Sequence, residues 1–305
     1  MKPLREAVRP TTIIKPEKLR RLLGADLVIA SETFQHTGSF KFRAAYNVVL
    51  NVPNEEMIGV SSGNFGQALA YACSLAGRKC TIVMPHNSAS VKVEAVRSYG
   101  AEVDLINVNQ VSRAERVEQL SEERPDAYLA SAYDDQFVID GNSTLGDELV
   151  EMGVDADVFV IPVGGGGLIA GTIDSFKRNG CKASIVGAEP AMANDAARSF
   201  AAGELIANAA EPQTIADGAR TLSLGKLNWP IIRDGAAKMI EVSEAKIAEA
   251  LRHYYAEANL KVEPTGALSL GALLEHPDVF AGKKVCLIVS GGNVDTAVYA
   301  DLITG

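Results

Sequence analysis

Apolar, β-rich runs alternate with longer helix-like segments along almost the whole chain. Most of these runs end in Gly, Ser, Asn or Pro, the residues that favour turns. This alternation is typical of βα units that build a largely parallel sheet, so we expect a doubly wound α/β fold. The expected strands lie at residues 25–32, 57–62, 79–85, 101–108, 127–133, 157–163, 183–189 and 284–290.

Four of the expected strands end in residues with unusual chemistry. These ends are Ser61 to Gly66, Gly164 to Gly167, Glu189, and Ser290 to Asn293. Ligands in doubly wound folds bind beyond the carboxyl ends of the strands. We therefore expect the four segments to meet at one shared site.

Length and charge narrow the class of protein. A chain of 305 residues is longer than a typical single-core domain, which predicts two lobes with a cleft between them. The formal net charge of −9 and the thinly spread Lys and Arg residues argue against nucleic-acid binding. No stretch approaches the ~20 apolar residues of a membrane span, and the first residues lack the apolar core of a signal peptide. We expect a cytoplasmic protein with no nucleic-acid or membrane partner.

Lys41 stands where an extended stretch gives way to a helix-like run, in the segment Thr37 to Arg43. The positive end of a helix disfavours the ammonium form, and exclusion of water lowers the pKa of a lysine further. A neutral lysine amine is the form that makes an imine with a carbonyl group. Taken alone, a lysine in a first helical turn is usually a solvated surface residue, so this hypothesis depends on the other motifs.

A second motif, Ser61 to Gln67, lies between an expected strand and an apolar helix. Its small residues allow a carboxylate to approach the backbone, and free N–H groups at a helix start bind anions. An ordinary helix cap is the alternative, although the Ser-Ser-Gly-Asn run offers more donors than capping needs.

The third motif is the run of four glycines, Gly164, Gly165, Gly166 and Gly167, after a buried strand. Successive glycines lose much backbone entropy on folding, which is easier to understand if their amides wrap an anion such as a phosphate. A dinucleotide site is the competing interpretation, because G-x-G-x-x-A fits here and Glu189 ends the next strand. That alternative leaves the Lys41 and Ser290 segments unexplained.

Ser290 to Asn293 closes the last expected strand, and Glu263 to Gly266 opens the helix before it. A hydroxyl at a strand end can hydrogen-bond a ring nitrogen without protonating it, whereas a carboxylate would hold the ring as pyridinium. A neutral ring favours β-elimination or proton exchange at Cα over transamination. A simple turn and a proline at the first helical position are the alternatives for these two segments.

Taken together and in this order, the segments resemble the fold-type II pyridoxal-phosphate (PLP) enzymes, in particular the serine racemase and serine/threonine dehydratase family. The resemblance rests on FQHTGSFKFRAA, SSGNFGQALAYA, VGGGGLIAG, VEPTGA and SGGN, and it covers nearly the whole chain. It implies a discontinuous large lobe of residues 1–51 and 133–305, with a small lobe of residues 52–132 inserted between them. It also implies a homodimer.

The same resemblance assigns roles to individual residues. Lys41 would be the Schiff-base lysine and the Cα proton acceptor, and Ser62 the second base of a racemase. The substrate would lie against the segment from Ser61 through Gly63 to Phe65 and against Arg113. A divalent cation, Mg²⁺ or Ca²⁺, would bind Glu189, the Ala193 carbonyl and Asp195, since oxygen ligands suit both ions. The cofactor would contact Phe40, Asn64, Gly164 to Gly167, Glu263, Ser290 and Asn293.

The implied activity is that of a dehydratase that converts a β-hydroxy amino acid to a 2-oxo acid and ammonia, with racemisation in competition. Phe65 stands where the family usually has histidine, which leaves the substrate open among serine, threonine, 3-hydroxyaspartate and phenylserine. Racemisation alone, β-replacement, a nicotinamide-dependent (NAD) oxidoreductase and a non-catalytic binding protein are the alternatives.

Overall fold

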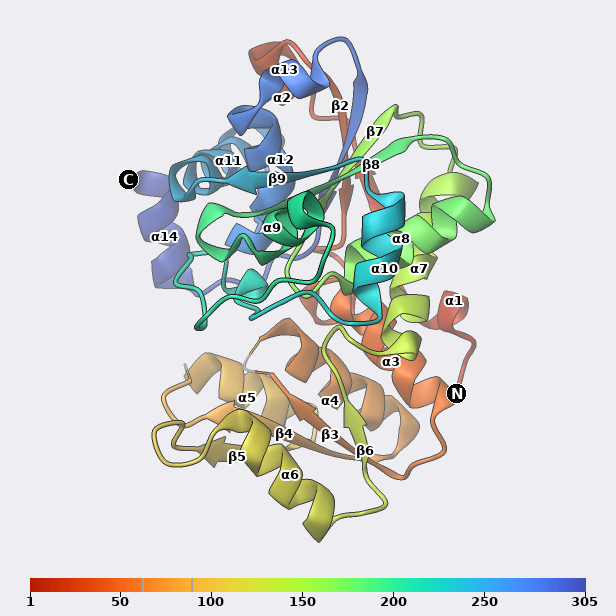
Figure 1. Ribbon diagram of the computed structural model, residues 1–305, viewed down its shortest axis with the longest axis vertical. Coiled ribbons are helices and arrows are strands. Elements are labelled where there is room, and N and C mark those ends of the chain that lie inside the picture. The colour runs from red at the N-terminus through yellow and green to blue at the C-terminus, as the bar shows by residue number, and fades with distance from the viewer. Residues whose placement is uncertain (62, 89) are drawn as a thin grey trace.

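The computed structural model describes residues 1–61, 63–88 and 90–305. Within these residues the chain forms one six-stranded and one four-stranded sheet. The two sheets lie in separate lobes, seen at the top and bottom of Figure 1. The predicted doubly wound α/β class is confirmed.

The six-stranded sheet builds the large lobe in the order β1-β2-β10-β7-β8-β9. Only the β1–β2 pair is antiparallel, and the other neighbours run parallel. Its strands are β1 (Thr12–Ile14), β2 (Asp26–Ser31), β7 (Val158–Pro162), β8 (Ser184–Pro190), β9 (Lys238–Val242) and β10 (Lys284–Val289).

The all-parallel sheet of the small lobe has the order β5-β4-β3-β6. Its strands and helices come from one continuous stretch of chain. The lobe boundaries at 52 and 132 remain a prediction with which this topology agrees. The elements are β3 (Glu56–Val60), α4 (Asn64–Ala76), β4 (Lys79–Pro85), α5 (Ser90–Ser98), β5 (Glu102–Ile106), α6 (Arg113–Glu123) and β6 (Tyr128–Ala130).

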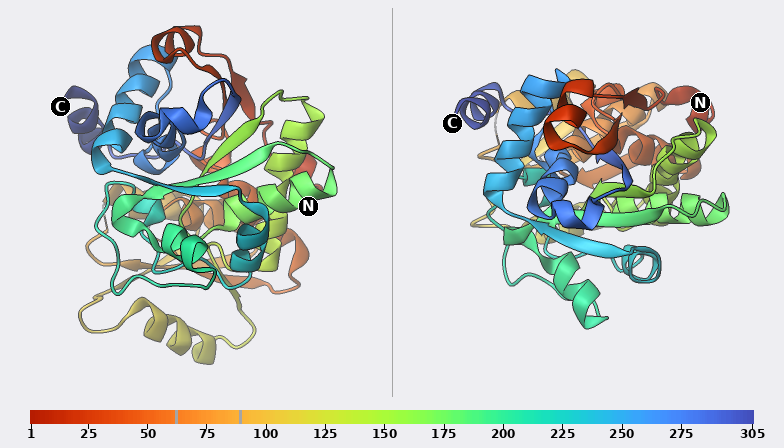
Figure 2. Two further views of the ribbon diagram at one scale, coloured as in Figure 1. Left: turned by 45° about the horizontal axis from the view of Figure 1, so that its top comes forward. Right: turned by 90° about the horizontal axis from the view of Figure 1, so that it is seen from above.

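Helices cover both faces of the large sheet (Figure 2). The alternation of side chains along β7 shows why: Val158 and Val160 pack with residues of α11 and α12, while Phe159 and Ile161 pack with residues of α7 and α8. The helices outside the small lobe are α1 (Leu4–Ala7), α2 (Glu17–Leu23), α3 (Lys41–Asn51), α7 (Gln136–Glu151), α8 (Gly167–Arg178), α9 (Asp195–Ala202), α10 (Asn228–Gly235), α11 (Glu244–Ala258), α12 (Pro264–Glu275), α13 (Pro277–Phe280) and α14 (Thr296–Thr304).

Helix α3 lies where the two lobes meet, because it packs against α4 of the small lobe and α7 of the large lobe. Its first residue is Lys41.

Eight of the ten strands overlap those predicted, but β1 and β9 were missed. Both are edge strands, so their pattern is weaker than that of the buried central strands. None of the described helices is long and apolar enough to cross a membrane.

Candidate active site

The segment that precedes Lys41 is fastened to the end of β10. The Phe40 amide donates to the Ser290 carbonyl oxygen at 2.9 Å, and the Gly292 amide donates to the Gly38 carbonyl oxygen at 3.0 Å. Two parts of the chain that lie about 250 residues apart are thereby joined by backbone hydrogen bonds. The fold therefore brings Lys41 and Ser290 together, as the strand-end argument predicted.

Among the described residues, the Lys41 amine lies between aromatic rings and has a single, neutral hydrogen-bond acceptor. Its Nζ donates to the Ala132 carbonyl oxygen at 2.7 Å and stands 5.0 Å from the Phe40 ring centroid and 5.8 Å from that of Phe65. Burial lowers the pKa of Lys41 from 10.5 to about 8, although the charge of Glu263 opposes this shift. At pH 7 the neutral fraction is then roughly 300 times that of an ordinary lysine. A neutral amine is the reactive form.

Three side chains link four segments around Lys41. Asn293 Nδ2 donates to the Thr37 carbonyl oxygen at 2.6 Å and to Asn64 Oδ1 at 2.8 Å. Asn64 Nδ2 in turn donates to Glu263 Oε1 at 2.8 Å and Oε2 at 3.0 Å. Burial raises the pKa of Glu263 to about 8, while the hydrogen bond from Asn64 lowers it. Asn64 belongs to the small lobe, so this chain of hydrogen bonds spans the two lobes.

Three hydroxyl groups in the same region are buried without a hydrogen-bond partner among the described residues. They are Ser290 Oγ, Ser39 Oγ and Thr37 Oγ1. An unmade hydrogen bond of a buried polar group costs about 1–3 kcal/mol. Such a group is expected where a ligand supplies the missing partner, and Ser290, only 2% exposed beside the Lys41 segment, fits the ring nitrogen of PLP.

The four glycines form the turn between β7 and the N-terminus of α8. A Cβ atom at Gly165 would lie 2.1 Å from Cγ of Tyr133, and Gly166 has a φ of +87°. The amides of Gly164, Gly165 and Gly166 donate to no backbone acceptor within the described ranges. A helix N-terminus with free amides is an anion site, so the turn fits a phosphate group.

Tyr133 connects the glycine turn to Lys41, and the sequence analysis did not select it. Its ring abuts Gly165, and its chain neighbour Ala132 accepts the hydrogen bond from Lys41. Both residues follow β6, at the end of a strand that the pattern predicted. The rule that ligands bind at strand ends could have identified them.

The residues predicted to bind the substrate lie in different settings. The Gly63 amide donates to Ser61 Oγ at 3.2 Å, just before α4 begins at Asn64. Phe65 is 1% exposed and belongs to a core cluster that the small lobe shares with α3. Arg113 begins α6 and pairs with Glu211 of the large lobe at 3.3 Å, with both side chains largely exposed. Ser62 lies outside the described residues.

The predicted cation ligands lie at a different helix. Glu189 accepts hydrogen bonds from amides in the first turn of α9, and Asp195 Oδ1 accepts one from Asn208 Nδ2 at 2.8 Å. Burial raises the pKa of both carboxyl groups, that of Asp195 to about 6. Over residues 1–61, 63–88 and 90–305, no three His, Cys, Asp or Glu side chains gather as a metal cluster. We expected Glu189 to share the site of Lys41. The Glu189 carboxyl group instead faces α9, and none of its contacts among the described residues reaches the Lys41 segment.

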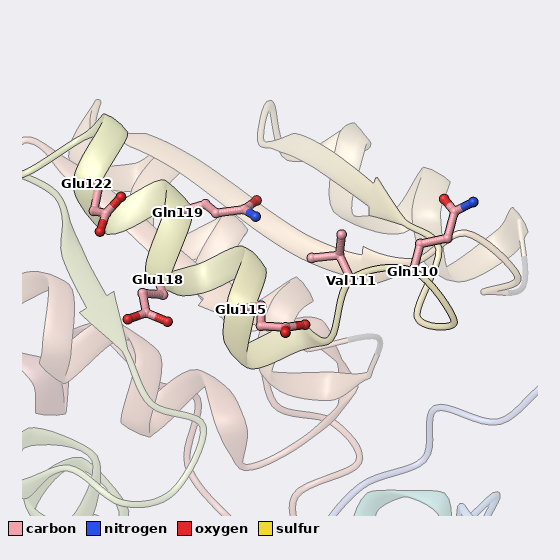
Figure 3. A pocket seen from close by; sticks show the side chains of 6 residues that line it. All are labelled: Gln110, Val111, Glu115, Glu118, Gln119 and Glu122. Carbon is pink, nitrogen blue, oxygen red and sulfur yellow. The ribbon is translucent and has the colours of Figure 1, made fainter.

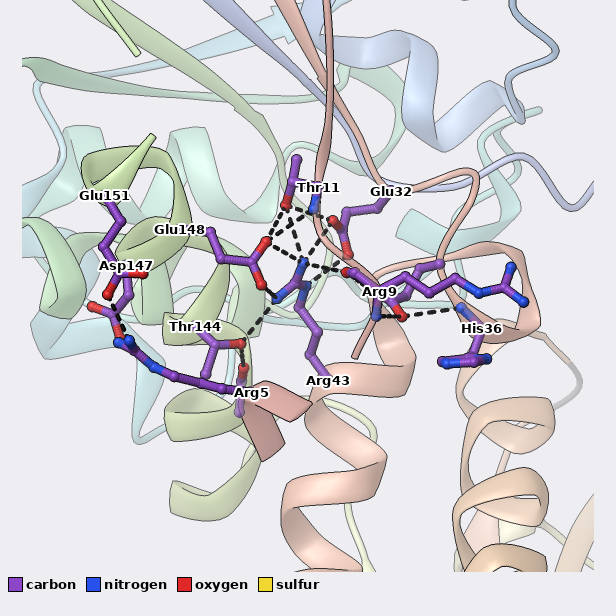
Figure 4. A network of polar contacts seen from close by, with 12 residues as sticks. Arg5, Arg9, Thr11, Glu32, His36, Arg43, Thr144, Asp147, Glu148 and Glu151 are labelled. Carbon is purple, nitrogen blue, oxygen red and sulfur yellow. Dashed lines mark hydrogen bonds and ion pairs between the residues drawn. The ribbon is translucent and has the colours of Figure 1, made fainter. Parts of the chain in front are cut away.

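A buried ion network surrounds Arg43, two residues after Lys41 in the chain (Figure 4). Arg43, which is 0% exposed, donates to Glu32 Oε2 at 2.7 Å and to Glu148 Oε1 at 2.8 Å. Thr11 and Thr144 accept further hydrogen bonds from its guanidinium group. Burial alone would lower the pKa of Arg43, but the two carboxylates raise it above its ordinary value. The network joins α3 to α7 and to the end of β2, and so fixes the helix that carries Lys41.

Of two hollows in the described structure, one is lined by the residue that accepts the hydrogen bond from Lys41. A cavity of about 510 Å³ between the lobes is lined by Ala132 and Tyr133, among others. A second hollow of about 380 Å³ lies along α6 and is lined mainly by Glu and Gln side chains (Figure 3). Glu115, one of them, is already engaged in capping α6 with Ser112. The first hollow is therefore the one that belongs to the candidate site.

The chain belongs to the family described as "Pyridoxal-phosphate dependent enzyme", whose model matches residues 4–291. It is 37% identical to an L-threo-3-hydroxyaspartate ammonia-lyase of Saccharomyces cerevisiae, over 99% of this chain and 93% of that protein. It is 35% identical to a serine racemase of Dictyostelium discoideum, over 99% and 95% of the two chains. The crystal structure of a T.th. threonine deaminase superposes with a TM-score of 0.89 at 39% identity, covering 96% of this chain and 95% of the other.

These comparisons confirm the predicted family, its fold and its cofactor class. They also agree with the predicted activity, because the relatives are named as ammonia-lyases and racemases. The NAD-dependent oxidoreductase finds no support, since the glycine turn belongs to a chain of the PLP family.

Proposed function

We propose that this protein is a PLP-dependent ammonia-lyase that converts 3-hydroxyaspartate to a 2-oxo acid and ammonia. The observation that carries this proposal is the Lys41 amine, with its lowered pKa, in a segment that is hydrogen-bonded to Ser290, whose buried hydroxyl has no partner among the described residues. The similarity of this chain to an L-threo-3-hydroxyaspartate ammonia-lyase over nearly its full length supports this substrate. Serine and threonine belong in the same test, because the identities to a serine racemase and a threonine deaminase are comparable.

In this proposal the described residues hold PLP from several sides. The amides of Gly164 to Gly167 bind its phosphate group, and Ser290 Oγ hydrogen-bonds its ring nitrogen. Phe40 and Asn64 contact the ring, and Glu263 and Asn293 fix the orientation of Asn64. When bound, PLP supplies an electron sink that stabilises negative charge at the substrate Cα.

Lys41 has two tasks in this proposal. Its Nζ would hold the cofactor covalently, and as a free amine it would accept the proton from the substrate Cα. The low pKa of Lys41 suits both tasks, because each begins with a neutral amine. The aromatic rings of Phe40 and Phe65 exclude water from around the amine and so preserve that pKa.

The substrate α-carboxylate is proposed to bind the segment from Ser61 through Gly63 to Phe65, where α4 begins. Ser62, on the family resemblance, would return a proton from the opposite face of the cofactor. That step would make racemisation a second activity, and the similarity to serine racemase supports it. Arg113 would help to hold the substrate if it exchanged its ion pair with Glu211 for a bond to the ligand.

Three further features belong to the proposal. Glu189, the Ala193 carbonyl and Asp195 would hold Mg²⁺ or Ca²⁺. This is supported by their oxygen donors and by the buried Asp195 Oδ2, which has no partner in the part of the chain that the structure describes. Metal analysis of the purified protein, with thermal unfolding before and after chelation, tests this site. A homodimer follows from the family resemblance, and light scattering tests it. A cytoplasmic location is the expectation drawn from the sequence.

The activity is tested by measuring ammonia and 2-oxo acid release from L- and D-serine, threonine, 3-hydroxyaspartate and phenylserine. The PLP-loaded wild type is compared with Lys41→Ala. We expect equal amounts of both products from 3-hydroxyaspartate with the wild type alone. Consumption of an added thiol with no net ammonia would instead indicate β-replacement. Inversion without ammonia would indicate a racemase.

A further inference from the structure

Asn142 is a buried asparagine of α7 whose side-chain amide makes no hydrogen bond within the described residues. It is 0% exposed, and neither its Nδ2 nor its Oδ1 has a partner there. Buried amide groups are almost always paired, because the hydrogen bonds that they lose with water must be replaced. The unpaired amide of Asn142 therefore indicates that a bound group completes this position.

The Asn142 amide lies beside the first turn of α8. A Cβ atom at Gly167, the first residue of α8, would lie 3.3 Å from Asn142 Nδ2. One turn later, a Cβ atom at Gly171 would lie 2.9 Å from Asn142 Cβ. The two glycines thus allow α8 to approach α7 closely. They place the Asn142 amide next to the glycine turn, where backbone N–H groups are also available to an anion.

The same place is connected to Lys41 by two consecutive peptide groups. A Cβ atom at Gly167 would lie 3.1 Å from the Tyr133 carbonyl oxygen. The preceding carbonyl oxygen, that of Ala132, accepts the hydrogen bond from Lys41 Nζ at 2.7 Å. The Asn142 amide therefore belongs to the candidate active site, at the end where the glycine turn fits a phosphate group.

A second buried asparagine, Asn228 of α10, also contacts the glycine turn, but its donor is engaged. It is 0% exposed, and its Nδ2 donates to the carbonyl oxygens of Gly165 at 2.7 Å and Tyr133 at 3.0 Å. The C=O and N–H of a trans peptide point in opposite directions, so the first bond turns the Gly166 N–H away from Asn228. Asn228 thus fixes the turn, whereas the donor of Asn142 is left for a ligand.

We propose that Asn142 Nδ2 donates a hydrogen bond to the phosphate group of PLP, alongside the amides of the glycine turn. A hydrogen bond to a charged oxygen is stronger than one to a neutral acceptor. Asn142 then helps the site to prefer PLP over pyridoxal, which lacks the phosphate group. The inference depends on the cofactor class and not on the proposed substrate, so it can be tested even on a protein that releases no ammonia.

The first experiment measures the affinities of the apoprotein for PLP and for pyridoxal by absorbance titration. Wild type is compared with Asn142→Leu, in which leucine has nearly the shape of asparagine without its polar atoms, and with the smaller Asn142→Ala. We expect both variants to bind PLP roughly tenfold more weakly, the effect of one charge-assisted hydrogen bond, and pyridoxal as the wild type does. An equal loss for PLP and pyridoxal, or no loss for either, would overturn the inference.

The second experiment separates a ligand-binding asparagine from a structural one, with Asn228→Leu as the matched variant. Asn228→Leu should unfold at lower urea concentration as apoprotein, because it loses two hydrogen bonds. Asn142→Leu should be at least as stable as the wild type, because it removes two unpaired polar atoms. Inorganic phosphate, compared with chloride at equal ionic strength, should raise the unfolding temperature of the wild-type apoprotein more than that of Asn142→Leu.

The two experiments are read together. Loss of the preference for PLP over pyridoxal in both Asn142 variants supports the inference, whatever substrate the enzyme uses. Destabilised apoprotein in both Asn142 variants, with that preference unchanged, would show that Asn142 serves the fold and would overturn it.

Discussion

Two buried polar regions lie two residues apart in the chain and differ in how their groups are satisfied. Around Arg43, two carboxylates and two hydroxyl groups accept the hydrogen bonds of the guanidinium group. Around Lys41, one carbonyl oxygen accepts from the amine, and the hydroxyls of Ser39 and Ser290 have no partner in the described structure. The first region stabilises the fold, and the second is built for a ligand. Variants in the two regions should therefore fail in different ways.

The largest effect is expected at the reactive amine. Lys41→Ala should lower ammonia release by at least ~10³-fold, since both covalent attachment and proton transfer are lost. Its unfolding free energy should stay near that of the wild type, because burial already disfavours the charged amine and lowers its pKa. Ammonia assays and urea unfolding measure the two quantities. A strong loss of stability would show that Lys41, like Arg43, stabilises the fold, and would contradict this prediction.

In the ion network around Arg43, a substitution is expected to lower the stability of the fold. Arg43→Met should lower the free energy of unfolding by about 3–5 kcal/mol, because Glu32 and Glu148 lose their buried partner. Arg178→Met removes a half-exposed arginine from Asp147 and should cost about 1 kcal/mol or less. Urea denaturation of both variants provides the comparison. Similar losses in the two variants would contradict the structural role of the network.

Ser290→Ala should weaken PLP binding roughly tenfold, the effect of one hydrogen bond. The unfolding free energy without PLP should not fall, since the hydroxyl has no partner among the described residues. Absorbance titration with PLP and urea unfolding of the apoprotein test both parts. Destabilised apoprotein with unchanged PLP affinity would show that Ser290 serves the fold.

The smallest effect concerns pH. The rate of covalent PLP attachment should rise as pH passes through about 8, where Lys41 loses its proton, and level off above that pH. The charge of Glu263 raises the pKa of Lys41, so Glu263→Gln should move the midpoint to lower pH. Lys92 and Asp217 also act on Glu263 and are unchanged in this variant. Stopped-flow absorbance gives the profile, and a midpoint moved upward would contradict the assignment.

The sequence predicted the central strands and the segments at their carboxyl ends, because a strand buried on both faces leaves a strong apolar signature. The edge strands β1 and β9 lack that signature and were missed. Lys41, Ser290 and the glycine turn were predicted, since each breaks the local pattern at the end of a strand or the start of a helix. The lobe boundaries came from the family resemblance, not from composition.

Other parts of the site depend on contacts that no local pattern records. Arg43, Glu32 and Glu148 come from three separate elements, and each alone looks like a surface charge. Tyr133 became visible only through its contact with Gly165. Residues of this kind are recognised from tertiary structure, because long-range packing determines their role.

The central claim is that PLP is held covalently by Lys41. Borohydride reduction of the PLP-loaded protein, followed by peptide mapping with mass spectrometry, tests it most directly. The account predicts one pyridoxyl-phosphate adduct, on the peptide that contains Lys41, and its absence from Lys41→Ala. A reduced protein without an adduct, or with the adduct on a different lysine, would contradict the account.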